Sequence, residues 1–365
     1  MKPLILCLLF CLSPSFFTGQ AGDIGEETEK LTEIRQVESS LDAEARDVSG
    51  NLSLDGSYDT EGAIARLWNH FLDRFLAGIK KETKFAWKIL LTACAASMVM
   101  ILIPDQKRAG FAELGACCTA ALLLIGSAES VIPETRDALF RLSDYGKAAF
   151  PAYFMTVAAC GASVSASVKY ASVSFASNLY MELCQRALLP IVNAYLAVGI
   201  AGSLAGNGVL KALEKFLKWS AVSLMTLFTG GFCTYIGISG IVSGSADAVA
   251  VKAAKTVIAS LLPVVGGIVS DSASTILAAA TTIKSSAGVF CLIAVCAICA
   301  GPFAVLLAKM LLLKAVAAVS EMGCCERFAG LVSVSGNAMG LLLGMIGSYG
   351  VTLFYSFMSG LRIAA

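Results

Sequence analysis

Long apolar stretches recur along this chain and leave it few possible folds. Most are close to the 20 or so helical residues that cross the roughly 30 Å hydrocarbon core of a bilayer. Apolar residues make up 57% of the 365 residues, whereas charged residues make up only 15%. Because a bilayer interior satisfies no backbone polar group, such stretches fold as helices. The sequence therefore predicts an all-α, polytopic membrane helix bundle with seven or eight embedded helices. The predicted spans are residues 85–103, 113–132, 148–168, 187–206, 219–242, 256–280, 287–308 and 328–358.

The first 84 residues differ from the rest in composition. Residues 1–21 carry Lys2 before an apolar run, which is typical of a secretory signal peptide and predicts cleavage. Residues 22–61 are strongly acidic and predict a solvated, hydrophilic segment. Residues 62–84 repeat apolar positions at helical spacing and predict an amphipathic helix, which lies either on anionic lipid or against the protein's own spans. The remaining residues, 85–365, form the predicted multi-span membrane domain.

Three apolar stretches each contain a proline that is followed by small residues. Proline lacks a backbone donor and disrupts a helix. Irregular backbone at membrane depth is tolerated only where protein or water surrounds it, and weak internal repeats of broken helices occur in transporters. The pattern predicts broken helices beside a transport path; the alternative is ordinary kinks packed by neighbours. The candidates are Pro151, Pro190, Pro263, Gly266, Gly267 and Asp271.

Charged side chains in or beside the spans have two interpretations. They face a partner or a wet cavity, or they sit at an interface and reach water. Lysines have long side chains, so Lys169, Lys309 and Lys314 are expected to reach the interface. Asp271 has a short side chain, and the sequence leaves both interpretations open for it.

Several spans carry glycines four residues apart. Such spacing places the glycines on one helix face and allows another helix to approach closely. The sequence predicts helix-packing faces, and it does not say whether the second helix belongs to this chain or to a partner. The residues are Gly202, Gly206, Gly240, Gly244, Gly336, Gly340 and Gly344.

Catalytic and ligand-binding motifs are missing from the sequence. His70 is the single histidine, which argues against histidine-ligated metals and against Ser-His-Asp catalysis. The 13 cysteines lie mostly in apolar runs, and there is no phosphate-binding loop. The net charge of +1 gives no bias towards nucleic acid. We therefore expect a protein without enzymatic activity, cofactor, metal or nucleic-acid partner.

Residues 245–289 resemble the core signature of the stage III sporulation protein AE family. That signature has an acidic start, two lysines, an apolar Pro-Val-Val-Gly turn, a Ser-Asp pair and a further lysine. The general plan of signal peptide, hydrophilic region and many spans is also similar. The matching residues are Asp247, Lys252, Lys255, Pro263, Gly266, Asp271, Lys284 and Gly288.

The resemblance implies a non-enzymatic membrane subunit of a channel or secretion-like complex that links mother cell and forespore and is required for forespore development. It implies a multi-pass protein in the mother-cell membrane around the forespore, the outer forespore membrane. The implied partners are other membrane proteins of the stage III sporulation A operon, including an ATPase and ring-forming subunits, and a forespore-side channel protein. Membrane lipid is a further expected partner. Two alternatives stay open: a stand-alone secondary transporter for a small solute, and an assembly scaffold without a transport path.

Overall fold

The protein is an all-helical bundle. The computed structural model describes residues 43–49, 60–102, 106–159, 163–261, 266–322 and 326–361, and between residues 239 and 286 it describes only backbone. Within these ranges the chain is helical except at the turn formed by Gly206 and Asn207, which confirms the predicted fold class. The elements are α3 (Ala43–Ser49), α4 (Thr60–Leu102), α5 (Gln106–Ala159), α6 (Ser163–Leu183), the π-helical turn η3 (Cys184–Leu188), α7 (Leu189–Ala205), α8 (Gly208–Leu261), α9 (Gly266–Met322) and α10 (Glu326–Leu361).

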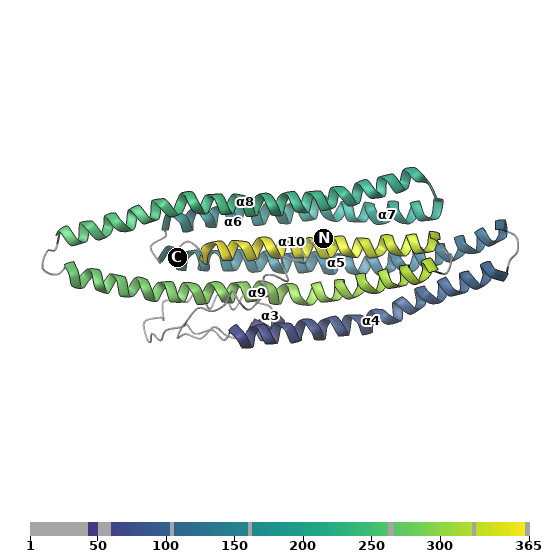
Figure 1. The fold of residues 1–365 in the computed structure, drawn as a ribbon, viewed down its shortest axis with the longest axis horizontal. Coiled ribbons are helices and arrows are strands. Elements are labelled where there is room, and N and C mark those ends of the chain that lie inside the picture. Colours follow the sequence, from purple (N-terminus) through teal and green to yellow (C-terminus); the bar gives the residue numbers. More distant parts are fainter. Residues whose placement is uncertain are drawn as a thin grey trace.

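The long helices run side by side along one axis (Figure 1). α6, η3 and α7 follow one another as a continuous rod, and α8 returns along it. α5 and α10 lie in the middle of the bundle, and α9 and α4 lie on the other side. The short helix α3 packs against α9. The long helices run antiparallel to the helices that precede them, and the most extensive packing is that of α9 against α10 and α4.

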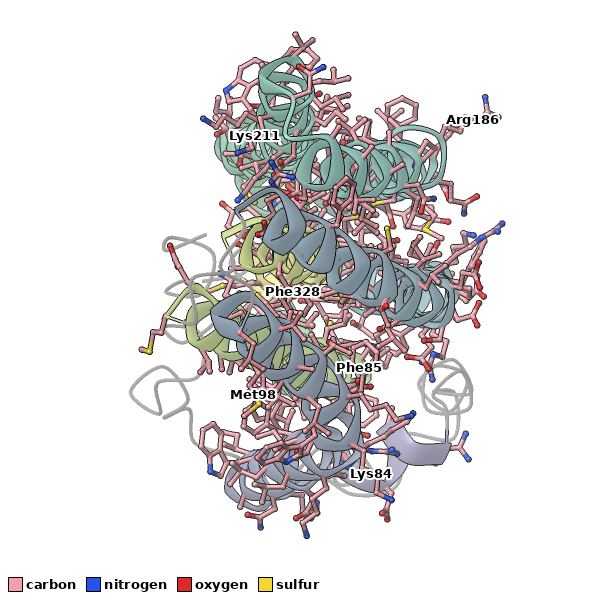
Figure 2. All side chains as sticks on the ribbon, turned by 90° about the vertical axis from the view of Figure 1, so that its right-hand side faces the viewer. Lys84, Phe85, Met98, Arg186, Lys211 and Phe328 are labelled. Atoms are coloured by element: carbon pink, nitrogen blue, oxygen red, sulfur yellow. The ribbon has the colours of Figure 1, made fainter. Side chains whose placement is uncertain are left out.

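α10 is the central helix of the bundle. It contacts α5, α6, α7, α8 and α9, and most of its residues are buried. In an end-on view its Phe328 lies near the centre of the molecule, whereas the side chain of Arg186 points away from the bundle (Figure 2). Because apolar side chains surround α10 on all sides, the interior of the bundle is built around this helix.

Three helices are much longer than a membrane span. α5 and α8 each contain 54 residues and α9 contains 57. At 1.5 Å per residue each is about 80 Å long. The hydrocarbon core of a bilayer is only about 30 Å thick. A hydropathy pattern alone therefore underestimates the length of these helices.

α5 shows this most clearly. The predicted spans 113–132 and 148–168 leave residues 133–147, which carry several charges, between them. The structure instead continues one helix through them. Thr135, Ala138, Leu142 and Tyr145 are buried at intervals of three or four residues, so the charged segment presents one face to the core. The charges occupy its other face, so the predicted span 113–132 and the first part of the span 148–168 belong to one continuous helix.

Five helical segments are long and apolar enough to cross a membrane in the described part of the chain. They are Glu113–Ala159, Ser163–Ala205, Gly208–Ile236, Ala287–Met322 and Arg327–Leu361. Two of the spans expected from the sequence do not form single helices. Residues 148–168 include the end of α5 and the start of α6, and residues 256–280 include the end of α8 and the start of α9. Hydropathy does not mark these helix ends, because the flanking helices are apolar on both sides.

The turn between α7 and α8 is well defined. Gly206 has φ +64°, and its backbone N–H donates to the Gly202 carbonyl at 3.0 Å. Glycine adopts this left-handed conformation without the strain of a side chain, so it ends the helix. The Asn207 side-chain oxygen accepts from the Val209 N–H at 3.0 Å and caps the start of α8.

Candidate functional site

Buried hydroxyl groups meet at the centre of the bundle. The hydroxyls of Ser177 on α6 and Tyr349 on α10 are 2.7 Å apart, and Tyr180 pairs in the same way with Ser348. The two tyrosine rings stack with their centroids 5.2 Å apart and their planes within 5°. We call these four residues the tyrosine–serine cluster. It joins α6 to α10 by polar contacts that only one relative register of the two helices allows.

A π-helical turn lies beside this cluster. In η3 the Leu189 N–H donates to the Cys184 carbonyl five residues back, and Pro190 follows directly. Proline cannot donate a hydrogen bond, and one extra residue in the turn lets the helix continue past it. The side chain of Cys184 is buried in the core. Pro190 is exposed, so it shapes the helix without lining the interior.

The C-terminal end of α10 is held by two side chains from other helices. Lys169 on α6 donates from its ammonium group to the Ser359 carbonyl at 2.9 Å. The Tyr153 hydroxyl on α5 donates to the Phe357 carbonyl at 2.9 Å. The last carbonyls of a helix have no partner within it, and a positive charge there is favourable. These contacts therefore fix the end of α10 to α5 and α6.

A second charged contact connects α4 with α9. The ammonium of Lys309 lies 3.5 Å from a carboxylate oxygen of Glu82, and their side chains are only 6% and 13% exposed. The Lys309 ammonium also lies 5.8 Å from the centroid of the Phe85 ring. A buried charge needs such partners, since removal from water is costly. The expectation that Lys169 and Lys309 reach the interface is wrong, because both are buried within the bundle; Lys314 is exposed.

One cavity lies between α4, α5 and α9, close to this ion pair. Its volume is about 370 Å³. Charged and polar side chains of α4 and α5 line one side, and α9 lines the other where Pro302 interrupts its hydrogen bonds. It is open to the surface, because charged residues of its lining such as Arg74, Glu134 and Arg141 are exposed, and we call it the α4–α5–α9 cavity. Its lining residues are Ala45, His70, Arg74, Lys81, Glu134, Thr135, Asp137, Arg141, Ala297, Ile298, Gly301, Pro302, Val305 and Leu306.

Two of the three prolines predicted to break helices, Pro151 and Pro190, lie on different helices, and both are exposed. Pro151 is exposed on α5, which continues through it, and Pro190 lies next to η3 near the middle of its rod. Pro263 lies outside the described residues. α8 ends and α9 begins at one end of the long axis, beyond α5 and α6 (Figure 1). The predicted interruption near residue 263 therefore falls between two helices at an end of the bundle.

Other predicted site residues lie in or near this end. Gly266 and Gly267 are the first residues of α9, and Asp271 lies in the turns that follow. Of the residues that carry the family resemblance, Asp247, Lys252 and Lys255 lie on α8 and Lys284 on α9. The side chains of all these residues lie outside the described part. The predicted transport path, and the access of water to it, therefore stay predictions.

The predicted packing glycines have different roles. A Cβ on Gly202 would lie 3.2 Å from the Leu210 Cβ, so this glycine does allow α7 and α8 to approach closely. Gly206 ends α7 instead. Cβ atoms on Gly336 and Gly344 would make ordinary contacts at 3.4 and 3.6 Å, and Gly340 is buried in the same helix. Gly240 and Gly244 lie on α8 with surroundings outside the described part.

Closer contacts occur at glycines that the four-residue pattern did not select. A Cβ on Gly199 would lie 2.4 Å from Val334 Cγ1, and one on Gly360 would lie 2.5 Å from Tyr153 Cε1. A Cβ on Gly288, which was noted only for the family resemblance, would lie 2.6 Å from Leu361 Cδ2. Gly350 has Cys299 as a similarly close neighbour. A side chain at any of these four positions would force its neighbour to shift, and no local spacing marks them.

Pro302 is the functional candidate that sequence reasoning missed. It lies inside a long apolar stretch, as the other three prolines do, but it is followed by Phe303 and not by a small residue. Unlike Pro151 and Pro190, it lines a cavity with charged walls. A proline inside an apolar helix indicates polar backbone at that point. This holds at Pro302 too, which the sequence analysis did not select.

The chemistry of these sites is one of packing, polar pairing and charge. Among the described residues, no group of three or more His, Cys, Asp or Glu side chains is placed to hold a metal ion. The hydroxyl, lysine and ion-pair contacts hold helices in register. Together with the five apolar segments, the architecture defines a multi-pass helical membrane protein.

Comparison with known proteins assigns the family. The family model for stage III sporulation protein AE matches residues 54–359, so this chain belongs to that family. Among curated proteins, stage III sporulation protein AE of Bacillus subtilis (strain 168) is 21% identical over 200 residues. These residues cover 55% of this chain and 50% of the relative, so the match spans half of that relative's length. No solved structure matches the chain.

Proposed function

We propose that this chain is a non-enzymatic membrane subunit of a sporulation-specific channel or secretion-like complex. In this proposal it sits in the mother-cell membrane around the forespore and supports forespore development. Its partners there are an ATPase and ring-forming subunits from the stage III sporulation A operon, together with a forespore-side channel protein. Membership of the sporulation family supports a sporulation role, and the five candidate spans support a membrane subunit.

The observation that favours a subunit over a stand-alone carrier is the closed packing around α10. Its residues Phe328, Leu342, Tyr349 and Phe357 are fully buried against surrounding helices. A solute path along this axis would require α10 to leave that packing, which costs the burial of many apolar side chains. A path between this chain and partner chains needs no such rearrangement. We therefore place the proposed path at a contact between chains.

Isolation of the complex from sporulating cells tests this proposal. We expect an affinity-tagged copy to support heat-resistant spore formation in a strain that lacks the native copy. The operon's ATPase and ring-forming subunits should copurify with it in mild detergent. A tagged protein that supports sporulation but purifies without any of these subunits would contradict the complex.

A stand-alone transporter is the first rival and makes a different prediction. The purified chain, reconstituted alone into vesicles, would then move a small solute down or against its gradient. We expect no solute uptake above that of protein-free vesicles. Uptake by the chain alone, abolished by a bulky substitution in α10 such as Gly340→Leu, would replace our proposal.

A scaffold without a path is the second rival. Under that hypothesis Asp271→Asn leaves sporulation intact, whereas Gly340→Leu abolishes it by disturbing the packing of α10. Our proposal expects Asp271→Asn to reduce the number of heat-resistant spores while the amount of protein in the membrane stays normal. Immunoblots of membrane fractions beside spore counts separate the two outcomes.

A further inference from the structure

The first turns of α8 carry three lysines on one face. Lys211, Lys215 and Lys218 follow one another at intervals of four and three residues, which places them on the same side of the helix. Lys314 of α9 packs against Gly336 of α10, where a Cβ would lie 3.4 Å from its Cγ, and its charge repels that of Lys218. Figure 2 looks along the bundle from this end and shows Lys211 on its outer surface. We call these four lysines the basic patch.

The protein does not neutralise the basic patch. Within the described part of the chain, none of the four ammonium groups forms an ion pair. Glu214 is the acid in the same turns of α8, and its carboxylate already accepts a hydrogen bond from the Tyr195 hydroxyl at 3.3 Å. Four lysines and one glutamate leave a net charge of +3. Because Lys211, Lys215 and Lys314 are exposed, this charge is available to an anionic partner.

Aromatic side chains lie directly beside the basic patch. Phe216 and Trp219 are 57% and 65% exposed, and their ring centroids are 6.1 Å apart. From Trp219 to Ile236 the candidate span contains no charged residue. Tryptophan is enriched where the hydrocarbon core meets the headgroups, and lysine side chains extend from there to the headgroups. This order of lysine, aromatic ring and apolar helix favours a lipid surface over an acidic protein.

Three pairs of successive helices meet at this end of the bundle, namely α4 with α5, α7 with α8 and α9 with α10 (Figure 1). Besides the basic patch, α5 has Lys-Arg at 107–108 in its first turn and α10 has Arg327. At the opposite end, residues 148–168 around the connection of α5 to α6 carry no charge, and Lys252 and Lys255 lie near the end of α8. Lysine and arginine are enriched on the cytoplasmic side of membrane proteins, which favours a cytoplasmic location for the first end. Cleavage of the predicted signal peptide gives the same orientation, because it leaves the start of α4 outside.

We propose that the basic patch lies at the cytoplasmic surface of the membrane and binds the headgroups of anionic phospholipids. The lysine ammonium groups pair with phosphodiester oxygens, and an anion held between Lys218 and Lys314 offsets their mutual repulsion. Trp219 lies at the depth where headgroups give way to acyl chains. Lysines next to an apolar helix recruit anionic lipid in this way. The surface does not depend on the function proposed above.

Quenching of Trp219 fluorescence by brominated lipid tests this surface. Trp68 and Trp87 are both exposed, so Trp68→Phe/Trp87→Phe leaves Trp219 as the single tryptophan of the full-length protein without disturbing its core. The protein is reconstituted into equal amounts of phosphatidylglycerol and phosphatidylcholine, with bromine on the acyl chains of one lipid or the other. We expect phosphatidylglycerol to be favoured about fivefold beside Trp219.

Charge variants in the same single-tryptophan protein show whether the lysines cause this preference. Lys211→Gln/Lys215→Gln should bring the ratio of the two lipids close to one. Arg136→Gln/Lys147→Gln is the matched control, because it removes two exposed positive charges from α5 and should leave the ratio unchanged. Equal quenching by the two brominated lipids before any lysine is replaced would overturn the proposal. Absence of quenching by either lipid would show that protein or water covers this surface, and the lipid assignment would be wrong.

The orientation has its own measurement. Lys211→Cys, in a protein whose native cysteines are replaced by serine, is exposed to a membrane-impermeant maleimide from one side of the membrane at a time. We expect labelling in inverted membrane vesicles and none in intact cells. Labelling in intact cells would place the basic patch outside and contradict its cytoplasmic location.

Discussion

The ammonium group of Lys169 donates to the backbone carbonyl of Ser359 at 2.9 Å, inside the bundle. Only 3% of Lys169 is exposed, although it lies in a candidate membrane span. The contact connects α6 with the C-terminal end of α10, where helix carbonyls lack internal partners. A lysine that could have extended to the membrane surface thus stabilises the central helix instead.

Replacement of Lys169 by methionine should destabilise the folded protein. The substitution keeps the length of the side chain but removes the donor to the Ser359 carbonyl. We expect a loss of about 1–3 kcal/mol, the cost of an unpaired buried polar group. Equilibrium unfolding in mixed micelles measures this loss. Lys147→Met is the control, because Lys147 is exposed in its ion pair with Asp144 and should change stability by less than about 0.5 kcal/mol. Equal stability of the two variants would contradict the role of Lys169.

Alanine substitutions should separate glycines that are sterically required from those that are not. At Gly199 and Gly360 a Cβ would come within 2.4 and 2.5 Å of Val334 and Tyr153, respectively. We expect each alanine to cost about 1–3 kcal/mol through overpacking. Gly230 and Gly231 serve as controls, because a Cβ at either position would meet no neighbour within 4 Å. Alanine there should be neutral or stabilising, since alanine favours a helix. Thermal unfolding of the four alanine variants in detergent measures these changes in stability.

The tyrosine–serine cluster should show strong coupling in a double-mutant cycle. Tyr349→Phe alone leaves the Ser177 hydroxyl without this partner in a buried position, and Ser177→Ala alone does the same to Tyr349. We expect each single variant to lose about 1–3 kcal/mol, because an unpaired buried polar group is costly. The double variant should lose less than the sum of the two. Additive losses in equilibrium unfolding would show that the hydroxyls do not act as a pair.

The ion pair between Lys309 and Glu82 should depend on both partners. Lys309→Met or Glu82→Leu alone leaves a buried charge uncompensated, and we expect each to cost about 3–5 kcal/mol. The double variant removes both charges and should recover most of that loss. The exposed pair of Asp144 and Lys147 is the matched control, worth at most about 1 kcal/mol. If the double variant is as unstable as the single ones, the pair acts through packing and not through charge.

The fold class follows from composition, but the helix ends do not. Residues 133–147 are a helix because Thr135, Leu139 and Leu142 face the core, and hydropathy averages over that face and the charged one. Similarly, α8 and α9 both continue past the ends of the predicted spans. A bilayer sets a minimum length for an apolar helix and no maximum. Prediction of membrane spans from hydropathy therefore locates the helices but does not give their full length.

The candidate sites show a comparable limit. At Pro190 the helix is locally irregular, because the π-helical turn η3 directly precedes Leu189 and Pro190. The proline pattern has limits elsewhere. It does not tell which proline lines a cavity, since Pro302 does so only because Arg74 and Glu134 lie opposite it on other helices. Nor does it show that Lys169 meets Ser359, 190 residues away. Contacts between distant helices depend on how the helices pair, which short sequence patterns do not contain.

The length of the helices has a consequence for how this protein meets its surroundings. α5, α8 and α9 are each about 80 Å long, yet the hydrocarbon layer takes up about 30 Å. Exposed charges at Arg136, Asp144 and Lys147 exclude that part of α5 from lipid. α5 therefore crosses the membrane with its apolar part and acts as a rigid spacer outside the hydrocarbon layer with its charged part. Such a chain can hold another protein at a fixed height above the membrane without a separate soluble domain.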